Sequence, residues 1–382
     1  MPKHTSEMMT YIDEVTGLEV CQLTSGESND YHMYFTDNSF TADDASIYFI
    51  SDRGSPTGNV YNLFVMDLNT GTMEQVTHEK GGIRSCTKSA EGEYLVYVTG
   101  NQLKACNTRT GTTDVIFEVG PDRRLDHPFI SPDKKRVGVP CNEATDVVRG
   151  ANYAGFKESM YAIKKSWIVM ADIDGKSSKE VYEDTHWMGH FQFAPDDPNT
   201  AMFCHEGPWN LVHQRIWLLD TRTGASRPCF RQGEGDCVGH EFWTRDGQIF
   251  FDNRRSGHDG TITSDKQQAT IEKACSTERP YVGLADKDGV VVRTIDMPYY
   301  CNHYHANREN SFLVGDENDN LVAIEIGSDI PKLVTMCNHA TSWRTQRTHC
   351  HPTFSWNDKR VLFTSDRDGS CNLYLFDFNQ IS

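Results

Sequence analysis

Short runs in which apolar and polar residues alternate recur along the chain, separated by clusters of Asp, Asn, Ser, Thr and Gly. Alternation with a period of two is typical of β-strands that bury one face. The first group predicts strands at residues 47–53, 62–67 and 75–77, preceded by turn-forming residues at 40–44. Strands this short, bounded by turn residues, predict an all-β fold.

The same phrase occurs seven times. Each copy opens with a Ser/Thr/Ala-x-Asp-type turn, and an alternating strand follows the turn. The openings lie 42 to 63 residues apart, at Thr41, Ser89, Ser131, Ala194, Thr244, Asn307 and Ser355. Repeats of this length that contain several short strands are typical of β-propeller blades. We therefore predict a seven-bladed β-propeller that forms a single domain over residues 1–382.

The seventh copy is incomplete, because its strands at residues 361–367 and 372–377 are followed by only a few residues. The missing Thr-Gly turn and final strand are present at the other end of the chain, at residues 15–24. We predict that this N-terminal strand completes the last blade, which would leave no half-built sheet edge open to aggregation.

Two of the steps between copies are longer than the others and contain insertions. One runs from Asn142 to Ser166 and includes Arg149 and Tyr153; the other runs from Arg254 to Arg279 and is polar and charged. Long loops on a rigid scaffold commonly carry function. Both are expected to be surface loops on the binding face, with a short helix as a further possibility.

Composition excludes several classes of function. The formal net charge of −17 and the lack of any Lys/Arg cluster beyond a pair or triple argue against nucleic-acid binding, which needs a basic face. No stretch approaches the ~18 consecutive apolar residues of a membrane span. Residues 1–11 are polar and do not resemble a secretory signal, and the 12 cysteines are scattered singly. These features favour a cytoplasmic protein with reduced thiols.

Histidines precede most of the predicted innermost strands at similar distances. In a propeller, residues in the same register of successive blades converge on the central axis, so these side chains are expected to gather in one place. A hydrogen-bonded structural histidine remains the alternative for any single member. The set consists of His32, His127, His186, His190, His240, His303, His305, His349 and His351.

Gln346, His349 and His351 form the densest group of candidate metal ligands. Two histidines separated by one residue point to the same face of a β-strand. Either His303 or His305 from the preceding copy could add a third imidazole. Imidazoles with one amide oxygen suit Mn, Ni, Co or Zn better than Ca or Mg, and open positions on the ion could bind a substrate carboxylate.

Arg215 is a candidate contact for an anionic substrate, because it lies at the predicted start of a channel-facing strand after His205. A guanidinium binds a carboxylate through two parallel hydrogen bonds. A surface ion pair is the alternative. In a chain with a net charge of −17, an anionic ligand would depend on such a local positive group.

Over nearly its whole length the chain resembles the oligogalacturonate lyases of polysaccharide lyase family 22. The segment Gln346–Phe354 carries the most specific part of this resemblance. The other matching segments are Tyr34–Thr36, His205–Pro208, Gln214–Trp217, His240–Trp243, Val314–Asp316 and Thr341–Trp343. The resemblance implies a cytoplasmic seven-bladed propeller that acts on oligogalacturonides from pectin. It gives no oligomeric state.

The resemblance also implies a Mn²⁺ site of three histidines and one glutamine. That set maps onto Gln346, His349 and His351, with His303 favoured as the fourth ligand over His305. Cys350 departs from the pattern, because a proline is expected between the paired histidines of relatives; its side chain is expected to point away from the site.

The implied reaction is β-elimination on short α-1,4-linked galacturonides, such as digalacturonate and its 4,5-unsaturated form, which releases 5-dehydro-4-deoxy-D-glucuronate. His240 would remove the C5 proton and Arg215 would stabilise the enolate-like charge. Arg149, His190 and His205 are further candidate substrate contacts.

Three rival functions have different requirements. A non-enzymatic scaffold of the Tol type explains the repeats but not the aligned histidines. A peptidase propeller would be accompanied by a Gly-x-Ser-x-Gly nucleophile motif, which the sequence lacks. A metal-dependent uronate epimerase or isomerase would also begin with C5 proton removal, and product analysis separates it from the lyase.

Overall fold

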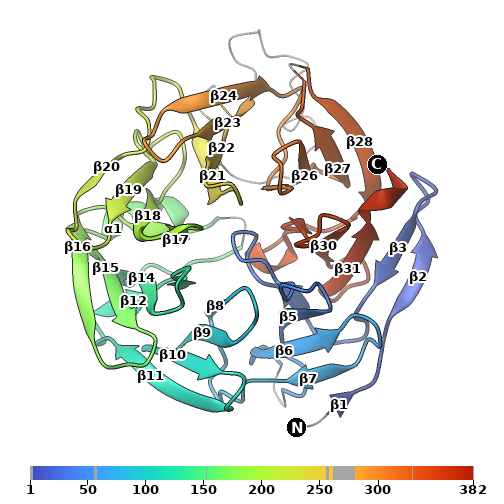
Figure 1. Cartoon of the computed structure of the whole chain (residues 1–382), viewed down its shortest axis with the longest axis horizontal. Helices are drawn as coiled ribbons and strands as arrows, with labels where there is room; N and C mark the ends of the chain where they lie inside the picture. Colours follow the sequence, from blue (N-terminus) through green and yellow to red (C-terminus); the bar gives the residue numbers. More distant parts are fainter. Residues whose placement is uncertain are drawn as a thin grey trace. The chain divides into compact units, whose positions relative to one another are not determined.

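The computed structural model describes residues 3–55, 58–151, 153–254, 258–260, 280–328 and 330–381. These residues form seven antiparallel sheets of four or five strands, and α1 (Phe156–Ala162) is the one α-helix among them (Figure 1). The fold is a seven-bladed β-propeller, which confirms the class predicted from the repeats. Two 3₁₀ turns, η1 (Gln346–Thr348) and η2 (Phe378–Gln380), lie in the C-terminal part.

Contacts between residues divide the chain into two compact units. The first contains the described residues of Met1–Ile83 and Tyr299–Ser382, and the second contains those of Arg84–Thr261 and Lys273–Pro298. We call them the terminal unit and the central unit, and describe each by itself.

The terminal unit contains three sheets. The first is built in the order β1-β7-β6-β5-β4, the second in the order β25-β26-β27-β28, and the third in the order β2-β3-β31-β30-β29. Their strands are β1 (Lys3–His4), β2 (Met9–Ile12), β3 (Glu19–Gln22), β4 (Asp30–His32), β5 (Ser46–Ser51), β6 (Asn62–Asp67), β7 (Met73–Gln75), β25 (Tyr304–Ala306), β26 (Phe312–Asp316), β27 (Asn320–Glu325), β28 (Lys332–Asn338), β29 (Thr353–Phe354), β30 (Arg360–Ser365) and β31 (Asn372–Asp377).

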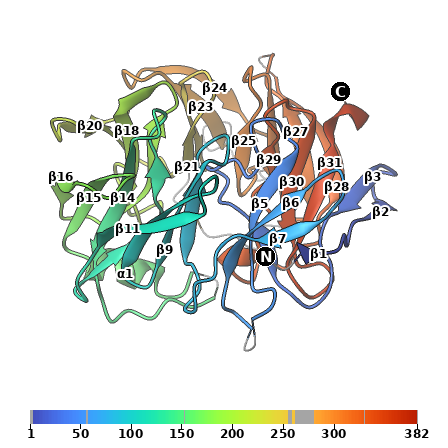
Figure 2. The ribbon, with the colours of Figure 1, turned by 60° about the horizontal axis from the view of Figure 1, so that its bottom comes forward.

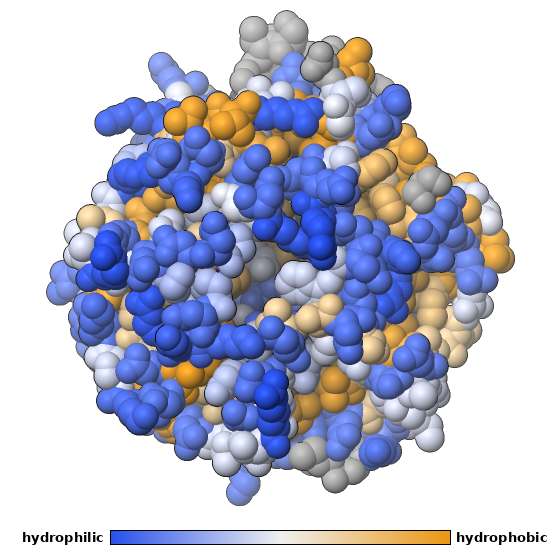
Figure 3. Space-filling view, viewed as in Figure 1, coloured by the Kyte–Doolittle hydropathy of each residue, from blue (hydrophilic) through white to orange (hydrophobic). Residues whose placement is uncertain are grey.

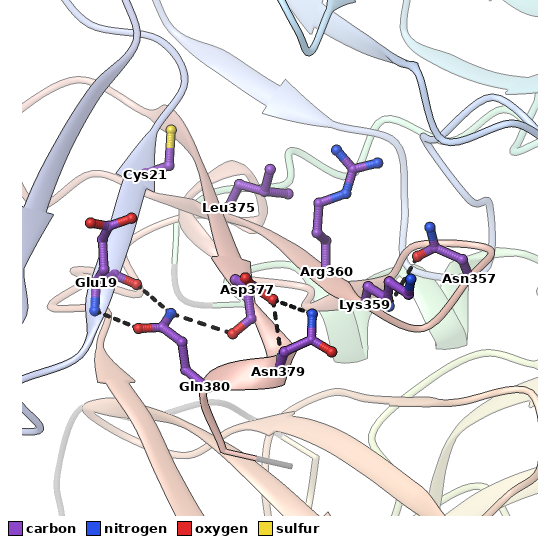
Figure 4. Close-up of a pocket in the computed structure, with 9 residues that line it drawn as sticks. All are labelled: Glu19, Cys21, Asn357, Lys359, Arg360, Leu375, Asp377, Asn379 and Gln380. Atoms are coloured by element: carbon purple, nitrogen blue, oxygen red, sulfur yellow. Dashed lines mark hydrogen bonds between the residues drawn. The ribbon is translucent and has the colours of Figure 1, made fainter.

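The N-terminal strand completes the seventh blade, as predicted. β3 pairs antiparallel with β31, and β2 adds a further strand outside β3 (Figures 1 and 2). Gln380 joins the two ends: its Oε1 accepts the Glu19 N–H, and its Nε2 donates to the Glu19 carbonyl, both at 2.9 Å (Figure 4). Val20 of β3 is fully buried among apolar residues of this blade, which include Phe376.

The central unit contains four sheets, in the orders β11-β10-β9-β8, β12-β14-β15-β16 with β13 paired to β14, β17-β18-β19-β20 and β21-β22-β23-β24. Their strands are β8 (Ser85–Lys88), β9 (Tyr94–Thr99), β10 (Gln102–Asn107), β11 (Thr112–Glu118), β12 (Arg123–Leu125), β13 (Phe129–Ile130), β14 (Arg136–Glu143), β15 (Ser166–Asp172), β16 (Ser178–Asp184), β17 (Met188–Ala194), β18 (Asp197–His205), β19 (Ile216–Asp220), β20 (Ser226–Pro228), β21 (Val238–Trp243), β22 (Ile249–Asn253), β23 (Tyr281–Ala285) and β24 (Val291–Asp296).

The repeated turn phrase has a physical basis in its hydrogen bonds. In the third copy, the Ser131 hydroxyl donates to Asp133 Oδ1 at 2.6 Å and accepts the Arg136 N–H at 3.0 Å. Lys134, between them, has a left-handed φ of 58°. The hydroxyl therefore replaces backbone partners at a tight turn, which is the reason Ser and Thr recur there. The same pair of bonds forms at Thr41, Thr244 and Ser355.

The two predicted insertions have different outcomes. The insertion from Asn142 to Ser166 contains α1, so the short helix is confirmed. Its N-cap, Gly155, has φ 78°, and a Cβ there would lie 2.4 Å from the Val148 carbonyl oxygen. Only glycine allows this approach. The insertion from Arg254 to Arg279 lies outside the described residues, except for Arg254 and residues 258–260.

The side of the molecule drawn in Figure 3 is mostly polar, with an apolar group over β24. Val290, Val291 and Val292, in and beside this outer strand, are all exposed. In the described part of the chain, no helix has the length and apolar character needed to cross a membrane.

Candidate functional site

Three of the predicted histidines meet in the terminal unit. His303, His349 and His351 each place a ring nitrogen within 4.8 Å of the others, and all three are buried. The ring centroids of His303 and His351 are 4.1 Å apart, and those of His303 and His349 are 5.3 Å apart. The structure thus brings His303 next to two histidines that lie more than forty positions later in the sequence.

The backbone that presents His349 and His351 differs from the prediction. We expected both on one β-strand, but they lie in an extended loop between η1 and β29. His351 has a left-handed φ of 46°, which is uncommon for a residue with a side chain and costs of order 1–3 kcal/mol. The two rings therefore meet without the regular alternation of a β-strand. Cys350 points into the apolar core instead, as expected.

Asp316 at the end of β26 orients His303. Its Oδ2 lies 2.8 Å from His303 Nδ1, and its Oδ1 accepts the His303 backbone N–H at 2.5 Å. This leaves Nε2 as the candidate ligand atom of His303. A carboxylate behind a metal-binding imidazole fixes the ring and raises its basicity. Burial raises the pKa of Asp316 to about 7, which its bond to the His303 backbone N–H opposes.

The surroundings favour a neutral imidazole at His349. Burial lowers the pKa of His349 well below its ordinary value, and the neighbouring His303 lowers it further. A metal ligand must be deprotonated, so an environment that removes the proton favours metal binding. Phe35 stacks on His351 at 6.0 Å, and Trp343 lies 5.5 Å from His349. Aromatic side chains therefore lie against two of the three buried histidines.

The structure separates His303 from His305. His305 Nδ1 accepts the Phe354 N–H at 3.3 Å, and His305 does not belong to the three-histidine cluster. His32 also has a structural role: its two ring nitrogens lie 2.6 Å from the Met33 carbonyl and 3.0 Å from the Cys350 carbonyl. Gln346 is exposed and lies in the turn η1, on the segment that leads to His349.

A second cluster surrounds Arg215 in the central unit. The Arg215 side chain is almost fully buried, and its Nε lies 2.9 Å from Glu241 Oε2 while its Nη1 lies 3.6 Å from Glu206 Oε2. His190 joins the same two carboxylates, at 2.7 Å from Glu241 and 3.3 Å from Glu206. Buried charges are tolerated only when they are paired in this way.

The charges within this cluster shift one another. Burial alone would lower the pKa of His190, but Glu241 and Glu206 outweigh it, and the net shift is upward. Burial likewise opposes ionisation of Glu241, yet Arg215 and His190 hold its pKa below the ordinary value. Arg215 directly precedes β19, which starts at Ile216 and is third in the strand order of its sheet.

His240 and Arg215 face the same tryptophan. The ring of His240 stands edge-on to Trp209 at 5.1 Å, and the guanidinium carbons of Arg215 and Arg254 lie 5.7 Å and 4.4 Å from the same ring. A Cβ on Gly239 would lie 1.8 Å from the indole, so only glycine admits Trp209 here. The predicted base and the predicted catalytic arginine therefore share one wall of the central unit.

Comparison with known proteins identifies the family. The family model described as oligogalacturonate lyase matches residues 3–381. The chain belongs to the oligogalacturonate lyase family. It is 26% identical to the oligogalacturonate lyase of Dickeya dadantii, over 96% of this chain and 95% of the relative. Its identity to the oligogalacturonide lyase of Pectobacterium atrosepticum is 27%, with the same coverage.

Solved structures of the family agree. An oligogalacturonate lyase in complex with manganese is similar, with a TM-score of 0.84 and 26% identity over 98% of this chain and 97% of that one. A second oligogalacturonate lyase, from Vibrio parahaemolyticus, has a TM-score of 0.83 and 25% identity over 98% of each chain. The non-enzymatic scaffold considered from the sequence is therefore set aside in favour of a lyase.

The remaining predicted substrate contacts of this oligogalacturonate lyase family member occupy different surroundings. His205 stacks on His186 at 4.2 Å, and its Nε2 lies 3.2 Å from Asp184 Oδ2. Arg149 is exposed and lies over the rings of Phe156 at 4.8 Å and Trp187 at 5.2 Å. Thus His190 joins the Arg215 cluster directly, whereas His205 and Arg149 have partners of their own.

The sequence analysis missed the residues that hold the predicted ones. Asp316, Glu206 and Glu241 were visible only as parts of matching segments, without a role, and Trp209 lay just outside one of them. A weak signal was present, because both His205 and His240 are followed by Glu. Adjacent residues on a strand point to opposite faces, so the pairing of these glutamates with Arg215 and His190 needs the tertiary structure.

Proposed function

We propose that this protein is an oligogalacturonate lyase that cleaves short α-1,4-linked galacturonides by β-elimination. The observation that carries the proposal is the buried cluster of His303, His349 and His351 in a chain of this family. The substrates would be digalacturonate, its 4,5-unsaturated form and slightly longer oligomers, and the product would be 5-dehydro-4-deoxy-D-glucuronate.

His303, His349, His351 and Gln346 are proposed to hold one divalent transition metal, Mn²⁺. Three imidazoles within 4.8 Å, one of them backed by Asp316, fit a borderline ion. An ion bound there would act as a Lewis acid toward the C6 carboxylate and make the C5 proton more acidic. The manganese complex of a similar lyase supports this choice of ion.

His240 is proposed as the base that takes the C5 proton, because an imidazole can accept a proton near neutral pH. Arg215 would lie against the charge that develops on the carboxylate as the proton leaves. Glu241 and Glu206 hold the Arg215 guanidinium in position before substrate arrives. Departure of the C4 oxygen then leaves the C4–C5 double bond on the product.

Arg149, His190 and His205 are proposed to contact the sugar acid. We also propose that the protein is cytoplasmic. Its proposed role involves neither nucleic acid nor a membrane. Eleven cysteines in the described ranges are thiols without disulfide partners, which fits a reducing compartment.

The direct test is an assay of the purified protein on digalacturonate and trigalacturonate, following the ultraviolet absorbance of the unsaturated product. We expect His240→Ala to abolish this turnover while elemental analysis still finds one metal ion. His349→Ala should lose the ion, and with it the activity. A saturated product that is epimeric at C5 would show that the protein is an epimerase and not a lyase. Undiminished turnover by His240→Ala would show that His240 is not the base.

A further inference from the structure

A cavity opens in the central unit, and its lining includes Arg149 and Trp187, whose contact is described above. It has a volume of about 390 Å³ and lies among the start of β8, the strands β12 and β14, the loop that follows β14, and α1. Three arginines line it: Arg84, Arg124 and Arg149. Such a concentration of positive charge is unusual in a chain with a net charge of −17.

The three guanidinium groups at the cavity lack the acidic partners that hold Arg53 and Arg215. Within the part that the structure describes, Arg84, Arg124 and Arg149 form no ion pair with a carboxylate, whereas Arg53 and Arg215 each contact two acidic residues. All three are exposed at the cavity, where a solute can reach them. Their charge is therefore left for a ligand.

The arginines are held in place by groups that do not cancel their charge. Arg84 Nη2 donates to the Leu125 carbonyl at 2.8 Å. Arg149 rests on the aromatic faces of Phe156 and Trp187, a contact that orients a guanidinium and leaves it cationic. Partial removal from water lowers the pKa of Arg84 and of Arg149, and the charge of Arg124 adds to this effect. Asp126 opposes it at both residues, and Glu206 opposes it at Arg149. An anion among them would relieve this repulsion.

Two carboxyl groups also line the cavity, and both are engaged elsewhere. Glu143 Oε2 accepts the Lys164 backbone N–H at 3.0 Å. Asp126 Oδ1 accepts the His127 N–H at 2.8 Å. Burial raises the pKa of Asp126, and the charge of Glu206 raises it further. Three arginines thus face two carboxyl groups. The balance of charge at the cavity is positive.

The cavity adjoins the Arg215 cluster within the same unit. Trp187, which lines the cavity, accepts the Glu206 backbone N–H through its carbonyl oxygen at 2.8 Å. Asn142, on the cavity wall, exchanges hydrogen bonds of 3.0 Å and 3.1 Å with the backbone of Met188. A chain of sugars that reaches Arg215 could therefore extend into the cavity.

We propose that Arg84, Arg124 and Arg149 form a subsite for the carboxylate of a third galacturonate unit, beyond the two units joined by the bond that breaks. The subsite favours oligomers of three or more units over the disaccharide. The inference rests on the proposed function for the identity of the sugar. Planar guanidinium groups match a carboxylate through paired hydrogen bonds, and neutral sugars lack that group.

The test is calorimetric binding to the metal-loaded His240→Ala protein, which holds ligand without turning it over. Digalacturonate, trigalacturonate and the methyl ester of trigalacturonate are compared. We expect the preference for trigalacturonate over digalacturonate, expressed as a ratio of Kd values, to fall about tenfold in Arg124→Gln and in Arg84→Gln. The methyl ester should bind weakly to every variant.

Arg222→Gln is the matched control, because Arg222 is an exposed arginine that pairs with Asp220 on another blade. An unchanged ratio in both cavity variants, an equal fall in the control, or no binding of trigalacturonate would overturn the subsite. Turnover by the wild type is measured separately. If binding depends on the arginines but the wild type shows no elimination, the proposed lyase reaction is wrong and the subsite stands. If the wild type shows elimination but the ratio of Kd values is unchanged in the cavity variants, the reaction stands and the subsite is wrong.

Discussion

Left-handed backbone conformations mark the candidate site at the scale of single residues. His351 and His190 have φ of 46° and 48°, and Trp343, which lies beside His349, has φ of 56°. Bulky residues adopt this region only where the surrounding structure compensates the strain. The ring of His190 contacts Glu241, and the ring of His351 belongs to the three-histidine cluster. The strained residues therefore lie at the proposed functional sites.

Asp316→Asn tests the role of the carboxylate behind His303. The amide keeps the size of the side chain but loses the charge that orients and polarises the imidazole, so affinity for Mn²⁺ should fall roughly 10- to 100-fold. Titration with Mn²⁺, monitored by calorimetry, measures the change. Asp296→Asn, at an exposed position in β24, serves as the control. Equal affinity of Asp316→Asn and wild type would contradict the role given to Asp316.

His190 provides a prediction about pH. Because its pKa is raised in the folded protein, its contribution to stability is complete below the unfolded value of about 6.5 and is lost as pH rises through the folded value. His190→Gln should therefore lower the free energy of unfolding by roughly 2 kcal/mol at pH 5.5 and by clearly less at pH 9. Urea unfolding at both pH values measures it, with the exposed His78→Gln as control. If the loss of unfolding free energy in His190→Gln grows as pH rises, the pKa of His190 is not raised in the folded protein.

At the scale of elements, the turn between blade strands and the shared seventh blade explain the fold. Hydroxyl-capped turns make each hairpin specific through local contacts, and β2 and β3 supply the strands that the C-terminal residues lack. Gln380 ties both ends of the chain with two hydrogen bonds. The stability of the seventh blade should therefore depend on the N-terminal segment.

Two valines in that segment give a matched pair. Val20 is fully buried in the core of the seventh blade, while Val15 is 62% exposed. Val20→Ala should lower the free energy of unfolding by about 2 kcal/mol, because it removes buried methyl groups and leaves a cavity, and Val15→Ala should change it by less than about 0.5 kcal/mol. Denaturant unfolding compares them. Equal effects would show that β3 does not contribute to the core as described.

At the scale of the whole molecule, metal binding and folding are linked. His303 and His349 are distant in the sequence and converge only in the folded chain, so Mn²⁺ should bind the native state in preference to the unfolded one. At a free concentration of 100 times Kd, Mn²⁺ should raise the free energy of unfolding by about 2.7 kcal/mol. His349→Ala should show no such increase in thermal unfolding, and a full increase in that variant would place the ion elsewhere.

The repeats are the reason that so much of the fold was predictable. Turn hydroxyls, strand alternation and the incomplete seventh copy are local patterns, and local hydrogen bonds and side-chain alternation dictate them. Strands 62–67 and 372–377 were predicted with the bounds that the structure gives to β6 and β31. Sequence spacing could not decide between His303 and His305 as the metal ligand. The structure decides it, because the ring of His305 accepts a hydrogen bond from the backbone of Phe354 in β29.

The sequence by itself determined the seven blades, the completion of the seventh blade by the N-terminal strand, and the identity of the residues that could hold a metal. Each of these follows from interactions between neighbours in the chain or from the periodicity of a strand. Only the tertiary structure decided which histidines meet, that Asp316 supports them, that Glu241 and Glu206 hold Arg215, and that three arginines share one cavity. Those contacts join residues on different strands and blades, where sequence spacing sets no distance.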